Sequence, residues 1–248
     1  ILSTRSGWVR FNMQTGPKIL IWDLEFRASE NWRGELKISP GYIICFSCKE
    51  LGKPKVKTYS LLTHPGVDPT DDRPLIKAIR KELENTDLHI LQYGKKTDYK
   101  FIRTKLLEYG LKPLPEPPVI VDTCQLAQQK LALKSNSLAS LARFFKLPKQ
   151  KLQVTEEEWF KAFAGHKSTL KKIERRCASD VSLTEEVYKK LLCIMDNHPN
   201  IYKAYRPGIC CAACGGHAFI SDGFRSTKAS LYRRLACKQC GVSTQEVI

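Results

Sequence analysis

Two carboxylates stand two positions apart where a short apolar segment ends: Asp23 and Glu25, directly after residues 19–22. The apolar and β-favouring composition of that segment predicts a strand. Side chains two apart on a strand point to the same face, so both carboxylates would lie together. Two acids at that spacing repel each other, and a divalent cation held between them resolves the repulsion. The alternative is that the strand ends here and both acids are solvated.

Two aspartates farther along the chain lie at predicted helices. Asp98 follows a Gly-Lys-Lys-Thr turn and opens a helix, where an aspartate is most often an N-cap for backbone N–H groups. Asp180 lies within a long predicted helix, beside apolar residues that face the core. A salt bridge to Arg176, one turn earlier, would explain Asp180 without a metal.

The C-terminal part carries a second candidate metal site, made of cysteines. Two Cys-x2-Cys pairs are present, and each is followed by glycine: Cys211 with Cys214, and Cys237 with Cys240. Thiolates at this spacing close tetrahedrally on one Zn²⁺, and the glycines allow backbone N–H groups to turn toward sulfur. The pattern resembles a zinc ribbon, with hairpin strands expected within residues 216–225 and 230–235. Without its metal, so short a segment with few large apolar side chains would not hold a fold.

Other cysteines fit a metal site less well. Cys210 and His217 are substitute zinc ligands that match the pairing poorly. Cys45 and Cys48 have the same spacing but lie in an apolar predicted strand, with no second pair nearby. We therefore expect Cys45 and Cys48 to be packing residues.

Hydrophobic periodicity predicts the elements that must position these residues. Strands are predicted over residues 19–25, 41–47, 55–61, 88–93 and 119–121. Helices are predicted over residues 71–85, 98–110, 123–131, 138–145, 156–164 and about 168–195. A three-stranded meander, then two strands alternating with helices, then helices alone predicts an α/β fold with a mixed five-stranded sheet flanked by helices.

Together, the acidic segments resemble the DEDD superfamily of 3′ to 5′ exonucleases, which have a ribonuclease H-like fold. The first motif of that family, Asp-x-Glu at a strand end, is Asp23-Leu24-Glu25. The second, Gly-x-x-x-Asp opening a helix, runs from Gly94 to Asp98, and the third is the helical Asp180 followed by Val181. The resemblance spans roughly residues 18–197.

The resemblance implies a hydrolase that cleaves nucleic-acid phosphodiester bonds with two divalent ions, Mg²⁺ or Mn²⁺. If the residue roles of that family apply to this chain, Asp23 bridges both ions. Glu25 and Asp180 then complete the site of the ion that activates the nucleophile. Asp98 holds the other ion largely through water. Asp122 corresponds to a non-catalytic acid at a strand end, which we expect to cap the helix that starts at Thr123.

The third motif departs from the family pattern. The family places a Tyr four residues before the aspartate, or a His five before it, where this chain has Arg176 and Arg175. Arginine stays protonated and cannot act as a base. Three alternatives follow: a metal-bound water ionises unaided, His166 reaches the site, or the domain binds without cleaving. Arg176 would instead clamp the phosphate, a role that fits guanidinium geometry.

The charge of the chain indicates a polyanionic partner. There are 41 Lys and Arg against 25 Asp and Glu, a net charge of +16. Basic and aromatic residues of the ribbon suggest that it contacts nucleic acid: Phe224, Arg225, Lys228, Tyr232, Arg233 and Arg234. A solvated hairpin face or a protein-docking surface is the alternative for the ribbon. We expect single-stranded nucleic acid or 3′ ends as the substrate, DNA in preference to RNA, with replication or repair proteins as further candidate partners.

Composition and segment lengths bound the remaining possibilities. No apolar run approaches the roughly 18 to 20 residues needed to cross a bilayer, and the N-terminus does not resemble a secretory signal. We expect an intracellular protein, cytoplasmic or nucleoid-associated. Its expected parts are an upstream extension or vector-derived remnant (1–17), the exonuclease-like domain (18–198) and the zinc ribbon (199–248). A non-catalytic nucleic-acid-binding protein and an endonuclease of the same fold are the alternative functions.

Overall fold

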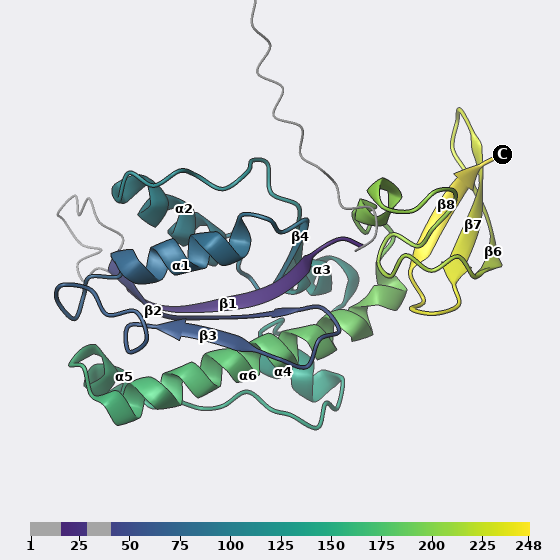
Figure 1. Ribbon diagram of the computed structural model, residues 1–248. Coiled ribbons are helices and arrows are strands. Elements are labelled where there is room, and N and C mark those ends of the chain that lie inside the picture. Colours follow the sequence, from purple (N-terminus) through teal and green to yellow (C-terminus); the bar gives the residue numbers. More distant parts are fainter. Residues whose placement is uncertain (1–15, 29–40) are drawn as a thin grey trace, which may run out of the picture. The chain divides into compact units, whose positions relative to one another are not determined.

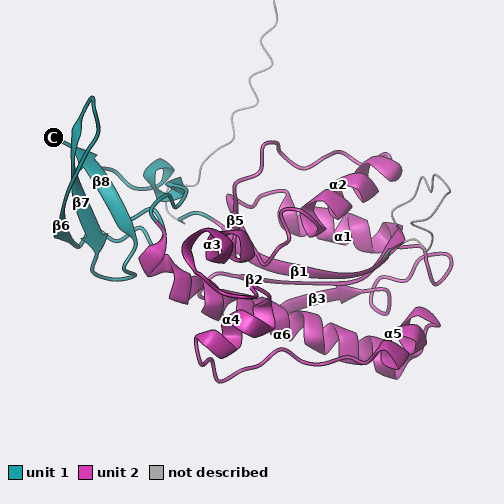
Figure 2. Ribbon diagram, turned by 180° about the vertical axis from the view of Figure 1, so that it is seen from behind, with its two compact units in different colours: residues 1–17, 196–248 teal, residues 18–195 magenta. Residues whose placement is uncertain are grey.

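The computed structural model describes residues 16–28 and 41–248. They form two compact units, one of residues 18–195 and one of residues 196–248 with residues 16 and 17 (Figure 2). Most of the expected N-terminal segment, residues 1–15, lies outside the described residues. In the described part of the chain, no helix is both long and apolar enough to span a membrane.

The larger unit is built on a mixed five-stranded sheet of order β3-β2-β1-β4-β5. Its central strand β1 (Ile19–Ala28) pairs antiparallel with β2 (Gly41–Glu50) and parallel with β4 (Leu88–Leu91). β3 (Lys57–Ser60) pairs antiparallel with β2, and β5 (Ile120–Asp122) pairs parallel with β4. This sheet confirms the predicted α/β fold class.

Six helices of the described chain flank the sheet in the larger unit, and Figure 1 shows α1 and α2 on one side of it and α4, α5 and α6 on the other. Their bounds are α1 (Arg73–Leu83), α2 (Asp98–Glu108), α3 (Thr123–Lys130), α4 (Leu138–Phe144), α5 (Glu156–Phe163) and α6 (Lys167–Leu191). Each begins and ends within a few residues of its prediction. The largest difference is at the end of α6, where the last turn tightens to a 3₁₀ helix over Leu192–Ile194.

The alternation of β1 decides which of its residues face which helices. Leu20, Trp22 and Leu24 pack into the hydrophobic core that includes side chains of α1 and α2. The alternate residues of the strand, including Asp23 and Glu25, project from the opposite face, where α6 lies. The pleat therefore directs both carboxylates of the first motif toward one helix.

β1 is longer than predicted, and the acidic pair lies within it. The predicted strand end after Glu25 is wrong, because the strand continues to Ala28 by pairing with β2. The ladder shifts register beyond Glu25: Glu25 pairs with Cys45 but Phe26 pairs with Ile43, which makes Ile44 the extra residue of a β-bulge. On the other side, β4 pairs with β1 only as far as Ile21, so both acids extend beyond that partner.

The smaller unit contains a three-stranded antiparallel sheet of order β6-β7-β8. Its strands are β6 (Phe219–Ser226), β7 (Leu231–Cys237) and β8 (Ser243–Val247), and a 3₁₀ turn (Ile201–Ala204) precedes them. The two strands expected between the cysteine pairs are present. β8 was not predicted, because Ser-Thr-Gln-Glu-Val lacks the apolar alternation that marks a strand.

Candidate active site and metal centres

The structure brings together three of the four predicted acids. One carboxylate oxygen from each of Asp23, Glu25 and Asp180 lies within 4.8 Å of the other two. Asp23 and Glu25 come from β1, and Asp180 comes from the middle of α6. One turn before Asp180, the Cys177 thiol donates to the Asp23 backbone carbonyl at 3.4 Å, which fixes α6 against β1 at the acids.

Asp98, the fourth acid, lies just outside that group. It is the first residue of α2, while Thr97 occupies the N-cap position, so the N-cap alternative for Asp98 is wrong. The Thr97 hydroxyl donates to Asp98 Oδ1 at 3.1 Å. A Cβ at Gly94 would lie 2.8 Å from Asp98 Oδ2 and 3.1 Å from the Leu91 Cβ, so a side chain at this position would displace the Asp98 carboxylate.

Asp122 supports the site without belonging to it. Its carboxylate caps α3 by accepting from the backbone N–H groups of Cys124 and Gln125, as expected. It also accepts from the N–H groups of Tyr93 at 2.9 Å and Lys95 at 3.1 Å. Tyr93 has a φ of 65°, which is uncommon for a residue other than glycine. Asp122 thus holds the turn that leads into Asp98.

Burial makes this cluster of acids electrostatically unfavourable without a cation. Burial and the charges of its acidic neighbours hold the pKa of Asp23 well above its ordinary value. Burial also raises the pKa of Glu25 and of Asp180, and it raises the pKa of Asp98 to about 7. Asp180 Oδ1 is buried and has no hydrogen-bond partner. Clustered carboxylate oxygens with one unsatisfied atom fit a hard divalent ion such as Mg²⁺ or Mn²⁺.

Two cationic side chains of the protein reach the same acids. Lys151 Nζ lies 2.7 Å from Asp180 Oδ2, and Arg176 Nε lies 3.5 Å from Glu25 Oε1 and 3.9 Å from Asp180 Oδ2. The Arg176 guanidinium also lies over the Trp159 ring, 5.3 Å from its centroid. The predicted Arg176–Asp180 contact is therefore present beside the cluster of acids.

The sequence places Lys151 among the basic residues expected to border the site, but it did not predict the contact of Lys151 with Asp180. The sequence shows it only as one of several basic residues after α4, and no periodicity relates it to Asp180. It comes from the connection between α4 and α5, which places it against α6. Its signal in the sequence is its membership of the basic residues in and after α4, which follow the Ser-rich segment: Arg143, Lys146, Lys149 and Lys151.

The structure does not bring His166 or Arg175 to the acids. His166 is exposed at the N-cap of α6, 14 residues before Asp180. At 1.5 Å per residue, that places it about 21 Å along the helix from Asp180, beyond the reach of an imidazole. Arg175 is exposed, whereas Arg176 is partly buried at the acids.

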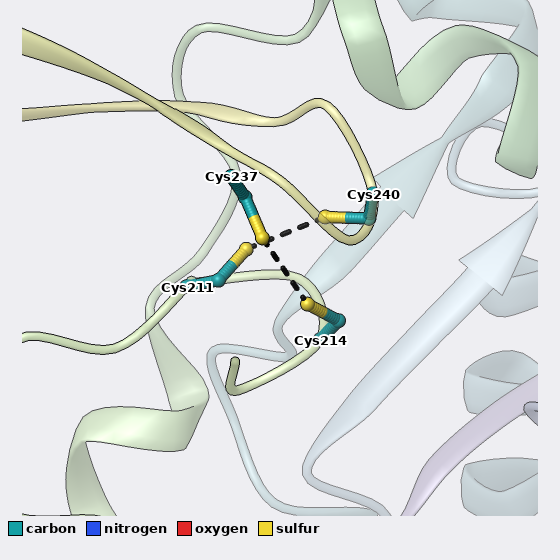
Figure 3. A group of neighbouring side chains, drawn as sticks. All are labelled: Cys211, Cys214, Cys237 and Cys240. Carbon is teal, nitrogen blue, oxygen red and sulfur yellow. Dashed lines mark hydrogen bonds between the residues drawn. The ribbon is translucent and has the colours of Figure 1, made fainter. Parts of the chain in front are cut away.

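The four cysteines predicted to hold zinc form one cluster in the smaller unit. Figure 3 shows their sulfur atoms pointing toward one another, and all four lie within 4.8 Å. Cys211 Sγ is 3.4 Å from Cys240 Sγ, and Cys214 Sγ is 3.6 Å from Cys237 Sγ. A tetrahedral zinc with Zn–S bonds of about 2.3 Å separates its sulfurs by about 3.8 Å. The cluster therefore fits one Zn²⁺.

The backbone of the two cysteine pairs repeats the same turn. Gly215 N–H donates to Cys211 O at 2.8 Å, and Gly241 N–H donates to Cys237 O at 2.9 Å. Both glycines have positive φ, of 68° and 78°, as a left-handed turn requires. The glycine after each cysteine pair therefore allows the backbone to turn there, as the sequence predicted.

The other cysteines and His217 lie outside this cluster. His217 is exposed and its Nδ1 lies 2.9 Å from Ile209 O, while Cys210 is buried beside the cluster without joining it. Cys45 and Cys48 are buried in hydrophobic cores on opposite faces of the sheet, which confirms their packing role.

No protein-family model matches the chain, and no curated protein matches it. Its fold is similar to that of the family B DNA polymerase from the hyperthermophilic archaeon Pyrobaculum calidifontis, with a TM-score of 0.52 and 14% sequence identity. The match covers 88% of this chain, which spans 32% of the length of the polymerase chain. At this identity the likeness shows a common fold.

Proposed function

We propose that the chain is a metal-dependent 3′ to 5′ exonuclease that hydrolyses nucleic-acid phosphodiester bonds. The observation that carries the proposal is the convergence of Asp23, Glu25 and Asp180 from a strand and a distant helix, with Asp98 nearby. Acids that were merely solvated would not be expected to bring their carboxylate oxygens within 4.8 Å of one another. The net charge of +16 and the likeness to part of a DNA polymerase support nucleic acid as the substrate class.

The acids define where the reaction would take place. Asp23, Glu25 and Asp180 would hold a divalent ion, and the family resemblance assigns a second ion to Asp98 and Asp23. A divalent ion supplies a water of lowered pKa and neutralises charge on the phosphate, which matters here because Arg176 cannot accept a proton. Asp122 keeps Asp98 in place by holding the turn before α2.

Arg176 provides a fixed donor for the substrate phosphate. Its Nε is buried and has no hydrogen-bond partner. Trp159 on one side and Glu25 on the other restrict the guanidinium, so little side-chain freedom remains to be lost when it binds a phosphate oxygen. A guanidinium in this position stabilises negative charge as it develops on the phosphate.

The ribbon would contribute binding, with its zinc in a structural role. Two neighbouring cross-strand pairs each combine an aromatic ring with an arginine, Arg225 with Tyr232 and Phe224 with Arg233, and the two pairs lie on opposite faces of the sheet. Such pairs suit a nucleic acid, because the ring stacks on a base while the guanidinium neutralises a phosphate.

A second candidate function is a nucleic-acid-binding protein without turnover. The ion pair between Lys151 and Asp180 favours it, since a lysine here partly neutralises the acids without any metal. The cleavage experiment below separates the two functions.

The deciding experiment is digestion of 5′-labelled single-stranded DNA and RNA of the same sequence with Mg²⁺ or Mn²⁺. We expect a ladder of shortened products from the native chain and none from Asp23→Asn, which keeps the shape of the side chain but loses its charge. Glu186→Gln is the matched control, because Glu186 is exposed on the same helix as Asp180. Equal products from Asp23→Asn would refute the metal centre, and cleavage of a circular strand would assign an endonuclease instead.

A further inference from the structure

The base of a lysine-lined cavity lies on the opposite face of the sheet from the acids. The cavity has a volume of about 380 Å³, and residues of β1, α1 and the β2–β3 turn line it. Leu20 and Cys48 form its base, and both belong to the core that includes side chains of α1 and α2. A cavity of about 300 to 1,000 Å³ with an apolar base is typical of a site for a small organic ligand.

Positive charge dominates the lining of this cavity. Two glutamates, Glu50 and Glu82, face five lysines: Lys18, Lys49, Lys53, Lys55 and Lys57. Glu82 Oε1 is already engaged, because it accepts from Lys57 Nζ at 2.9 Å and from the Tyr59 hydroxyl at 2.5 Å. Lys18 Nζ donates to the Glu82 carbonyl at 2.8 Å, which covers the negative end of α1. The acceptors on this wall are therefore satisfied within the protein.

Three of the ammonium groups are left for a ligand. Lys18 Nζ contacts a backbone carbonyl, and Lys53 and Lys55 are exposed on the β2–β3 turn. Within residues 16–28 and 41–248, none of these three lysines has a carboxylate partner. The other two are in ion pairs with glutamates of α1 and α6. Lysines gathered without acidic partners suit a phosphate group, which they bind as point charges.

Glu50 offers a hydrogen-bond acceptor at the same cavity. It is exposed at the end of β2, and its carboxylate has no hydrogen bond or ion pair with any described residue. A carboxylate accepts from an amino group such as that of adenine, while Leu20, Cys48 and Pro54 provide apolar surface for a ring. Phosphate donors, apolar surface and this acceptor together match the parts of an adenine nucleotide.

We propose that this cavity binds a nucleotide, with its phosphates at Lys18, Lys53 and Lys55 and its base against Leu20. The nucleotide is a ligand and not the strand that is cleaved, because the carboxylates of Asp23 and Glu25 project from the other face of β1. The inference therefore goes beyond the proposed exonuclease and does not depend on it.

The test is calorimetric titration of ADP into the zinc-loaded full chain, with no other divalent ion added. We expect ADP to bind the native chain, and Lys53→Met/Lys55→Met to bind it at least about tenfold more weakly, since two phosphate donors are lost. Both lysines are exposed on a turn, so the fold should not depend on them. The matched control removes two exposed lysines outside the cavity, and Lys77→Met/Lys134→Met should bind ADP as the native chain does.

Adenosine and inorganic pyrophosphate separate the two parts of the ligand, and each should bind at least about tenfold more weakly than ADP. Pyrophosphate that binds as tightly as ADP would overturn the nucleotide assignment, and so would a native chain that does not bind ADP. Unchanged affinity in Lys53→Met/Lys55→Met would overturn the location.

A short oligothymidylate distinguishes a free nucleotide from one that is part of a strand. If it binds through Lys53 and Lys55 while ADP does not bind, the cavity belongs to a strand-binding surface and the free nucleotide is refuted. None of these results alters the exonuclease proposal, which is tested by cleavage with the native chain and its loss in Asp23→Asn.

Discussion

Arg176 is a cationic side chain held in place at the acids by contacts on two sides. It contacts Glu25 and Asp180 on the acidic side and Trp159 on the other, so its position is fixed by three partners from three elements. A tyrosine or histidine in its place would bring a proton acceptor. The arginine brings a permanent positive charge with a spare donor, which suits phosphate binding and not proton removal.

Replacing Arg176 should therefore reduce turnover through the loss of a charge donor. We expect Arg176→Met to lower kcat by about 100-fold or more and Arg176→Lys to recover part of that loss, because an ammonium restores the charge without the planar fork. The measurement is single-turnover cleavage of labelled DNA at saturating enzyme. Arg175→Met is the control at the exposed neighbouring position. Full activity in Arg176→Met would rule out the phosphate clamp.

At the scale of elements, the pairing of β1 with β4 carries a pH-dependent contribution to stability. The Trp22 indole N–H donates to His89 Nδ1 at 3.0 Å, which requires that nitrogen to be unprotonated. Burial lowers the pKa of His89 to about 4. Since the folded pKa lies below the ordinary value near 6.5, the unfolded chain takes up the proton first as pH falls. Stability is therefore full above about pH 6.5 and decreases toward pH 4.

A variant that cannot titrate should lose this dependence. We expect the native chain to lose about 2 kcal/mol between pH 7 and pH 5 relative to His89→Asn, whose amide oxygen can still accept from the indole. Urea unfolding of both proteins at the two pH values measures the difference. Identical changes in the free energy of unfolding for the two proteins would show that His89 does not titrate in this way.

Local patterns in the sequence predicted the elements well, and contacts between distant segments account for what they missed. The period of two in β1 placed Asp23 and Glu25 on one face, and this prediction needed no knowledge of neighbouring strands. The continuation of β1 to Ala28 depends on pairing with β2, and the β-bulge at Ile44 depends on both strands. Lys151 meets Asp180 through the path of a connecting loop, which no periodic pattern encodes.

At the scale of the whole molecule, the two units depend on different sources of stability. The larger unit has a buried core on each face of its sheet, built from Trp22, Phe46 and many aliphatic side chains. In the smaller unit, Ile220, Phe224, Leu231 and Val247 are exposed, so its strands bury little apolar surface. The four thiolates and their metal must therefore supply what its small core does not.

Loss of one thiolate should consequently unfold one unit and spare the other. We expect Cys237→Ala to release one zinc per chain and to expose the segment after residue 196 to proteolysis, while the urea midpoint of the larger unit stays unchanged. Elemental analysis of the purified proteins gives the zinc content, and limited digestion followed by mass spectrometry locates the cleavage. Cys210→Ala is the matched control, because Cys210 adjoins the cluster without joining it and its loss should leave the zinc in place. Full zinc content in Cys237→Ala, or loss of zinc in Cys210→Ala, would show that the ligand set is different from the four cysteines named here.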